Sequence, residues 1–323
     1  MNSKYINKID FKDIKGFRIG NAQDYKAMTG VTTIIFENEN RAGIHICGGG
    51  PASRESHLLH PLTNPHTINA IVLSGGSAFG LAASAGVVKY LEENNIGYKL
   101  SNYLIPLVVQ SCIFDLNIGD KNIRPDFNMG YDSCLDSIDN NIKSGIIGAG
   151  TGATVGKIAG ISRAQKSGIG YYAMSFGDLQ IGAITVLNAV GDVFDYKSSE
   201  KIAGILDINR KEFANIFDEM YLQKYKTTEE NTTLSVILTN AKFSQSQMSK
   251  VAQMASYGLS RSINPVCTMS DGDTVYAISL GDIEADISLV GSLSAIAISE
   301  SINDAVNSSK TTEEDFLKMI NNK

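Results

Sequence analysis

The stretch YYAMSFGDLQIGAITVLNAV, residues 171–190, predicts a β-hairpin. Two apolar segments, Tyr171–Phe176 and Leu179–Val190, flank the dipeptide Gly177-Asp178. Glycine at the first position of a two-residue turn favours the type II′ geometry that joins antiparallel strands. We therefore expect antiparallel sheet with a large buried face.

More strands and a few helices are predicted on both sides of this hairpin. The expected strands are Val31–Phe36 with Gly43–Cys47 as its partner, Ala70–Leu73, TTLSVILTN at 232–240 and Thr274–Leu280. Helical spacing of apolar residues indicates helices after Ser77, over Met248–Ile263 behind a capping box at Ser244, and over Ile287–Val306. Regular strand–helix alternation, the mark of a doubly wound parallel sheet, is missing. The pattern thus predicts an α+β fold in which helices cover two sheets.

Composition narrows the class of function. The chain has 323 residues, 43% of them hydrophobic, and a formal net charge of -6 with scattered basic residues. This charge disfavours nucleic-acid binding, because a phosphate backbone is attracted by clustered Lys and Arg. No segment reaches the roughly 18 apolar residues of a membrane helix, and the N-terminus has no apolar signal segment. Four cysteines without C-x-x-C spacing are typical of buried reduced thiols. We expect a cytoplasmic protein without a membrane partner.

Several familiar motifs are present only in part. Gly148–Ala153 fits G-x-G-x-x-A, but no βαβ setting follows it, so a tight turn with close backbone packing is the better interpretation. Ser77 lacks the second glycine of a nucleophile elbow and is predicted to cap a helix instead. His57 and His60 have no third ligand at diagnostic spacing. The sequence therefore predicts neither a cofactor nor a metal.

A change in composition occurs near the start of the C-terminal third of the chain. Residues from about 197 to 231 are charged and polar and predict an exposed linker, and a strand beginning with Thr232 follows directly. A hydroxyl residue at a strand start is common. By itself this junction predicts no chemistry.

Eight further segments stand out along the chain: GFRIGNA (16–22), TGVTTI (29–34), GGGPASRESHLL (48–59), IVLSGGSAFGLAASAGVVKYLEE (71–93), GAGTGATVGK (148–157), NAVGDVFD (188–195), NTT (231–233) and MSDGDTVYA (269–277). In this order they resemble the self-processing peptidases of family S58. This P1-type group comprises the D-aminopeptidase-like and β-peptidyl aminopeptidases and also contains the nylon-oligomer hydrolases. The resemblance covers roughly residues 13–306 and is specific because long motifs keep their order.

The resemblance implies a four-layer αββα sandwich, related to that of ornithine acetyltransferase, built from residues 1–323 as a single domain. It implies that the precursor cleaves itself between Asn231 and Thr232 into chains 1–231 and 232–323, which stay together. It further implies a homo-oligomer, a tetramer of such pairs, and a small peptide or amide oligomer as substrate.

Thr232 is then the nucleophile of an N-terminal-nucleophile hydrolase. Cleavage frees its α-amino group, whose reference pKa of about 7.7–8.0 lets it take the hydroxyl proton near neutral pH. The substrate forms an acyl-enzyme through a tetrahedral oxyanion that needs preorganised donors. By the resemblance, the Asn188 amide is one such donor. Without the resemblance, Asn188 is a turn former at a strand end.

Three charged residues complete the set that the resemblance implies. Asp271 and Asp273, two positions apart, would orient the threonine amine and hydroxyl, and Lys157 would balance their charge and help set the pKa of the amine. On the residues alone, an ordinary D-G-D turn and a surface lysine explain them equally well.

Some positions differ from the β-peptide-preferring aminopeptidases. Those enzymes have Ser at the nucleophile, Ser and Glu in place of Asp271 and Asp273, and a tyrosine near Ile113 or Phe114. This chain is closer to the nylon-hydrolase branch, so strict aminopeptidase specificity is not implied. An acyltransferase on the same scaffold and a non-catalytic assembly protein are the alternatives.

Overall fold

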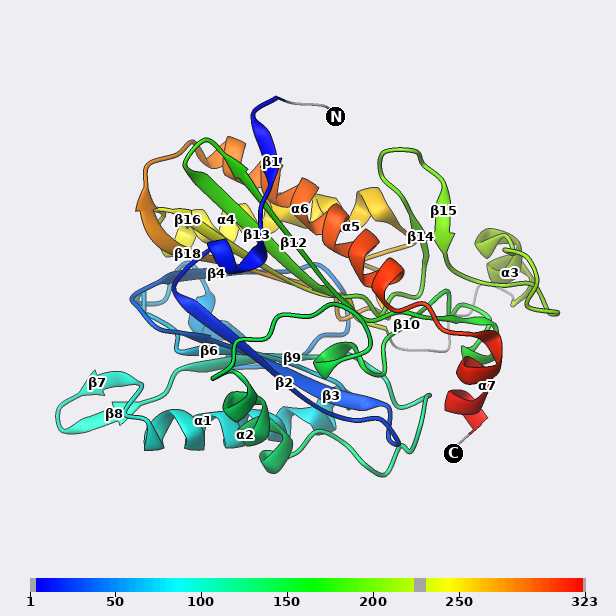
Figure 1. Cartoon of the computed structure of the whole chain (residues 1–323), viewed down its shortest axis with the longest axis horizontal. Helices are drawn as coiled ribbons and strands as arrows, with labels where there is room; N and C mark the ends of the chain where they lie inside the picture. The colour runs from blue at the N-terminus through cyan, green and yellow to red at the C-terminus, as the bar shows by residue number, and fades with distance from the viewer. Residues whose placement is uncertain (1–3, 224–230, 322–323) are drawn as a thin grey trace.

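Two stacked sheets form the centre of the computed structural model, which describes residues 4–223 and 231–321 (Figure 1). The larger sheet has the strand order β1-β12-β13-β16-β18-β4 and the smaller one β2-β3-β6-β9-β5. The larger sheet contains β1 (Ile6–Lys8), β4 (Arg41–Ile46), β12 (Ile169–Phe176), β13 (Leu179–Val186), β16 (Leu234–Ala241) and β18 (Thr274–Ile283). The smaller sheet contains β2 (Phe17–Asp24), β3 (Thr29–Phe36), β5 (Ala52–Arg54), β6 (Ala70–Ser74) and β9 (Val108–Cys112).

Helices cover the outer face of each sheet. Above the six-stranded sheet lie α4 (Gln245–Ala255), α5 (Tyr257–Ser262) and α6 (Ile287–Ser308), and below the five-stranded sheet lie α1 (Ala83–Glu93) and α2 (Phe127–Asp136) (Figure 1). The remaining elements are short: β7 (Tyr98–Leu100), β8 (Tyr103–Ile105), β10 (Thr154–Val155), β11 (Gln165–Lys166), β14 (Asp192–Phe194), β15 (Lys201–Ala203), β17 (Ile263–Asn264), α3 (Ile216–Leu222) and α7 (Glu313–Asn321). The predicted four-layer α+β sandwich is confirmed.

Three apolar layers hold the sandwich together. Neighbouring residues of β16 belong to different layers: Val236 packs between the two sheets, while Ile237 packs toward α4 and α6. Because successive side chains of a strand point to opposite faces, a strand buried on both faces is mostly apolar. This explains the apolar run Val236–Leu238 in the segment that follows Thr232.

Most of the elements predicted from the sequence are present. β12 and β13 form the expected hairpin, with Gly177 at a φ of +60° in its turn. Ser244 and Gln247 form the expected capping box, although the helix that follows is divided at Ser256 into α4 and α5. Ser77 does not cap a helix. It has a φ of +51°, and the helical turn that begins there has no side-chain cap.

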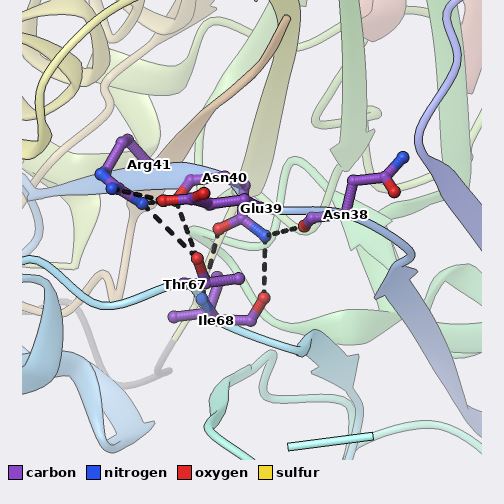
Figure 2. A network of polar contacts seen from close by, with 6 residues as sticks. All are labelled: Asn38, Glu39, Asn40, Arg41, Thr67 and Ile68. Carbon is purple, nitrogen blue, oxygen red and sulfur yellow. Dashed lines mark hydrogen bonds and ion pairs between the residues drawn. The ribbon is translucent and has the colours of Figure 1, made fainter. Parts of the chain in front are cut away.

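The expected pairing of the strands at 31–36 and 43–47 is wrong. β3 pairs with β2 and β6 in the smaller sheet, whereas β4 pairs with β18 in the larger one. The chain crosses between the sheets at Asn40, whose side-chain amide donates to the carbonyls of Asn38 and Ile68 and accepts from the Ile68 N–H (Figure 2). Arg41 adds bonds to the Asn40 carbonyl and to Glu39 (Figure 2). β3 and β4 were expected to pair because they are close in the sequence. They belong to different sheets because the chain crosses from one sheet to the other between them.

The segment expected to be an exposed linker, about 197–231, is folded over its described part. It contains β15 and α3, and Ile205 and Ile216 are buried in a small apolar cluster. Asn231 is 1% exposed. Residues 224–230 lie outside the described residues. A few apolar residues among the charged ones attach this segment to the rest of the molecule, because Ile205 and Ile216 pack against Ile158 and Val190.

None of the helices in the described ranges combines the length and the apolar character needed to cross a membrane.

Candidate active site

The Asn231-Thr232 junction lies at one end of the six-stranded sheet, directly before its central strand β16. β16 pairs antiparallel with β13 and parallel with β18. The end of β13 and the start of β18 therefore meet the start of β16. This topology brings Asn188, two residues beyond β13, and Asp273, one residue before β18, beside Thr232.

The peptide bond between Asn231 and Thr232 is held by three hydrogen bonds. The Thr232 hydroxyl donates to the Asn231 carbonyl oxygen at 2.5 Å. The Gly272 N–H donates to the same oxygen at 2.8 Å, and the Thr232 N–H donates to the Asn188 carbonyl at 3.0 Å. Thr232 is only 4% exposed. The Thr232 hydroxyl, the Asn231 carbonyl and the Thr232 nitrogen are thus each fixed in a site with almost no access to solvent.

Asn188 is locked by its neighbours. Its side-chain oxygen accepts from Lys157 Nζ at 2.6 Å and from the Thr154 N–H at 3.1 Å, and its Nδ2 donates to the Phe114 carbonyl at 2.9 Å. Lys157 Nζ also donates to the Asn188 carbonyl at 3.1 Å. Lys157 is 3% exposed, so the alternative of a surface lysine is excluded.

Asp271 and Asp273 are both buried next to the junction. Asp273 accepts from the Thr233 N–H at 2.6 Å and from the Cys267 N–H at 2.9 Å. Asp271 accepts from the Thr268 N–H at 2.8 Å. Burial, and then the charge of Asp271, raise the pKa of the Asp273 carboxyl above its usual range. Asp271 therefore closes its own turn, while Asp273 holds the backbone at Thr233.

Sequence reasoning missed the glycines that bring this turn to the junction. The Gly48 N–H donates to the Asp273 carbonyl at 3.1 Å and the Gly50 N–H to the Asp271 carbonyl at 2.8 Å. A Cβ on Gly48 would lie 2.2 Å from the Asp271 carbonyl oxygen. Three consecutive glycines before Pro51 were the available signal. Only glycine permits backbone to approach backbone this closely.

A buried pair of opposite charges supports the other side of the site. Asp115 follows Phe114 and accepts from Thr29 Oγ1 and from the Gly76 N–H, both at 2.7 Å; burial raises its pKa to about 6. Lys166 Nζ donates to the Ala153 carbonyl at 2.8 Å, and burial lowers its pKa to about 7. No local pattern identifies either residue, because Thr29 lies 86 positions from Asp115 and Ala153 lies 13 positions from Lys166.

The motifs that the sequence presented only in part have structural roles. Cβ atoms on Gly148, Gly150 or Gly152 would collide with neighbouring atoms at 2.2–2.3 Å, which confirms the expected close packing of this turn. His57 and His60 stack on each other with ring centroids 5.3 Å apart. Among residues 4–223 and 231–321, no three His, Cys, Asp or Glu side chains are grouped to hold a metal ion. The four cysteines are free thiols, but Cys47 and Cys267 are only half buried.

The arrangement suits acyl transfer from the chain itself. The Thr232 hydroxyl lies against a carbonyl that accepts a second, backbone hydrogen bond, and the charged side chains nearby are buried and hydrogen-bonded. A hydrogen-bond donor already in place, such as the Gly272 N–H, stabilises developing negative charge more effectively than water does, because it needs no reorganisation.

Solved structures identify the fold. The β-aminopeptidase of a Burkholderia species matches with a TM-score of 0.65 and 17% identity over 96% of this chain and 93% of its own. The L-aminopeptidase D-Ala-esterase/amidase of Ochrobactrum anthropi, described as a variant of the Ntn-hydrolase fold, matches with a TM-score of 0.67 and 15% identity over 95% and 92%. The chain thus has the fold of the N-terminal-nucleophile hydrolases.

Sequence comparison gives the family. The family model described as peptidase family S58 matches residues 7–316. An uncharacterized aminopeptidase of Mycobacterium leprae is 33% identical over 307 residues, which cover 84% of this chain and 79% of the relative. A 6-aminohexanoate-oligomer endohydrolase of Agromyces is 28% identical over 278 residues, 84% of this chain and 75% of the relative. This chain belongs to peptidase family S58, as the sequence motifs predicted.

Proposed function

We propose that this protein cleaves itself between Asn231 and Thr232 and then hydrolyses amide bonds with Thr232 as its N-terminal nucleophile. The observation that carries the proposal is the placement of the Thr232 hydroxyl 2.5 Å from the Asn231 carbonyl oxygen, inside a site that is 4% exposed at Thr232. Family membership supports the same conclusion, because family S58 is a peptidase family.

Self-cleavage begins with attack of Thr232 Oγ1 on the Asn231 carbonyl carbon. The hydroxyl proton is transferred to the Thr232 nitrogen, the C–N bond breaks, and an ester replaces the peptide. Water then hydrolyses the ester and leaves a carboxylate on Asn231. The products are a free hydroxyl and a free α-amino group on the same residue.

That amino group is the base of the mature enzyme. Near neutral pH it accepts the Thr232 hydroxyl proton as the hydroxyl attacks the substrate amide, and it returns the proton to the leaving amine. Asn188, held by Lys157, is proposed to donate its amide to the substrate oxyanion. Asp273 keeps the chain at Thr233 in place through its 2.6 Å hydrogen bond.

The two chains should remain one domain after cleavage. β16 and β18 belong to the second chain, and they pair with β13 and β4 of the first. Separation would break two ladders and expose both apolar faces of the sheet. A single folded unit, residues 1–323, is therefore the expected form of both precursor and product.

Small peptides or amide oligomers are the proposed substrates, because the relatives are named as aminopeptidases and as a 6-aminohexanoate-oligomer endohydrolase. These names do not favour the acyltransferase alternative.

A homo-oligomer, a tetramer of cleaved pairs, is also proposed. The β7–β8 hairpin supports it, since Leu100 and Tyr103 are 53% and 72% exposed. Light scattering on the purified protein measures the assembly. A cytoplasmic location, which suits four free thiols, stays a prediction.

Two variants of one residue test the nucleophile. Thr232→Ala removes the hydroxyl and should abolish both self-cleavage and amide hydrolysis. Thr232→Ser keeps a hydroxyl at the same place and should still cleave. Gel electrophoresis over time and hydrolysis of an aminoacyl p-nitroanilide are the measurements. A Thr232→Ala chain that cleaves at the parental rate would refute the assignment.

A further inference from the structure

Self-cleavage requires a donor for the oxyanion that forms on the Asn231 carbonyl. In the uncleaved chain the Asn188 amide donates to the Phe114 carbonyl, and the Asp271 and Asp273 carboxylates accept backbone N–H groups of their own loop and of Thr233.

We propose that the backbone N–H of Gly272 is the oxyanion donor of the self-cleavage step. This inference rests on the proposed function, because it assigns a group to that reaction. The Gly272 N–H already donates to the Asn231 carbonyl oxygen at 2.8 Å, so it points at the atom on which negative charge develops. A donor at this distance before the attack is preorganised, which is the condition for a large effect on rate.

The position of Gly272 supports this role. An ideal Cβ on Gly272 would lie 2.6 Å from Thr232 Oγ1, so a side chain here would press on the nucleophile. The φ of Gly272 is not positive, so the backbone conformation of the turn does not by itself require glycine at this position. Close approach to the nucleophile does require it. The D-G-D motif thus contributes its glycine to the reaction.

The loop around Gly272 is fixed from both sides. The Asp271 carboxylate closes the turn by accepting from the Thr268 N–H, and Asp273 joins it to Thr233. From the opposite side the Gly50 N–H donates to the Asp271 carbonyl at 2.8 Å. Asp271 and Asp273 therefore act as positioning residues for the Gly272 N–H.

The oxyanion step balances within the chain. As the Oγ1–C bond forms, the carbonyl π electrons move onto the oxygen, which receives the Gly272 hydrogen bond. As the C–N bond breaks, the electrons return, and the proton lost from Oγ1 is on the Thr232 nitrogen. The N–H of Gly272 is neither consumed nor transferred.

Replacing one backbone N–H by an ester oxygen tests the donor. Glycolic acid at position 272, introduced into the full chain by nonsense suppression in vitro, removes the N–H and adds no side chain. We expect self-cleavage to slow by about 10²–10³-fold, the usual effect of losing one oxyanion donor. The measurement is the time course of the labelled full-length chain and its two products on a gel.

The same replacement at Gly145 is the matched control. It removes a backbone hydrogen bond of the same length, 2.8 Å, to the Ile169 carbonyl, and neither residue is hydrogen-bonded to the Asn231 carbonyl or to the turn around Gly272. Its cleavage rate should stay within a few-fold of the parent. Parental cleavage in the position-272 ester, or equal slowing in both esters, overturns the inference while leaving Thr232 as nucleophile. A parent chain that never cleaves overturns the proposed function and this inference together.

Discussion

The two ends of the neighbouring strands β16, β18 and β4 differ in how far their charged side chains are exposed to solvent. At the far end lies an open cavity of about 550 Å³, lined by charged side chains of which Glu39, Lys242 and Glu284 are 65–83% exposed. At the near end the Thr232 junction is closed, and Lys157, Asp271 and Asp273 are at most 3% exposed. Charges in water are screened and contribute little, whereas buried charges keep fixed partners.

A closed junction suits an intramolecular reaction. The attacked carbonyl belongs to the preceding residue, so no substrate has to enter. With Thr232 only 4% exposed, an external amide cannot reach Oγ1 until Asn231 has moved. The uncleaved chain is therefore expected to be inactive, and cleavage both creates the base and opens the site.

The largest effect in this comparison is expected at Asn188. Asn188→Ala removes the proposed oxyanion donor for the substrate, and turnover of an aminoacyl p-nitroanilide by the cleaved enzyme should fall by about 10²–10³-fold. Asn40 is the matched control, because it is also a buried asparagine with a fully used amide, at the far end. Equal kcat values for the two alanine variants would remove Asn188 from the mechanism.

Lys157 is expected to act through Asn188. Lys157→Met deletes the two hydrogen bonds that hold the Asn188 side chain and carbonyl, at 2.6 and 3.1 Å. A displacement of about 1 Å at a reacting group costs on the order of 10²-fold, so kcat should fall by up to that factor with little change in KM. Lys242→Met, at the open end, should leave kcat unchanged. A kcat for Lys157→Met equal to that of Lys242→Met would contradict this positioning role.

Buried charge at the near end should also make stability depend on pH. The pKa of Asp115 is raised to about 6 from 3.8 by burial, so the folded state holds this proton more tightly than the unfolded state. The contribution of Asp115 to the free energy of unfolding is fully present below the pKa of the unfolded state and is lost as the pH rises through about 6. The difference amounts to about 3 kcal/mol.

Asp115→Asn should remove this dependence. Relative to the parent, its free energy of unfolding should increase between pH 4 and pH 7, by an amount approaching that difference. Urea unfolding at several pH values measures it. Glu39→Gln, an exposed carboxylate of the open end, is the control and should show no such trend. Parallel pH curves for parent and Asp115→Asn would contradict the assignment.

The smallest effect is expected for a substitution at the open end, and it should change the free energy of unfolding without changing the rate of self-cleavage. Asn40→Ala leaves the N–H and carbonyl of the fully buried Ile68 without their side-chain partner, which should cost about 1–3 kcal/mol. The rate of self-cleavage, measured well below the melting temperature, should not change. Slower cleavage would show that the two ends are coupled.

The sequence predicted the local elements of this molecule and failed for contacts between distant parts of the chain. Hydrophobic periodicity is a local signal, and it found the hairpin β12–β13, the capping box at Ser244 and the helix α6. It failed where the chain changes sheets at Asn40, since pairing of β4 with β18 joins residues more than 200 positions apart.

The site shows the same limit. Thr232, Asn188 and Asp273 meet because β13, β16 and β18 are neighbours, and no local pattern encodes that order. The family motifs supplied it instead. Asp115, Lys166 and the Gly272 N–H lay outside those expectations, because burial and backbone donors have no signature in a single sequence.

The central claim is most directly tested by N-terminal sequencing of the purified, active protein. Our account predicts two termini in equal amounts, that of the full chain and a second one reading Thr-Thr-Leu, in place of one chain of 34.7 kDa. An active enzyme with a single terminus and an unbroken bond before Thr232 would contradict it.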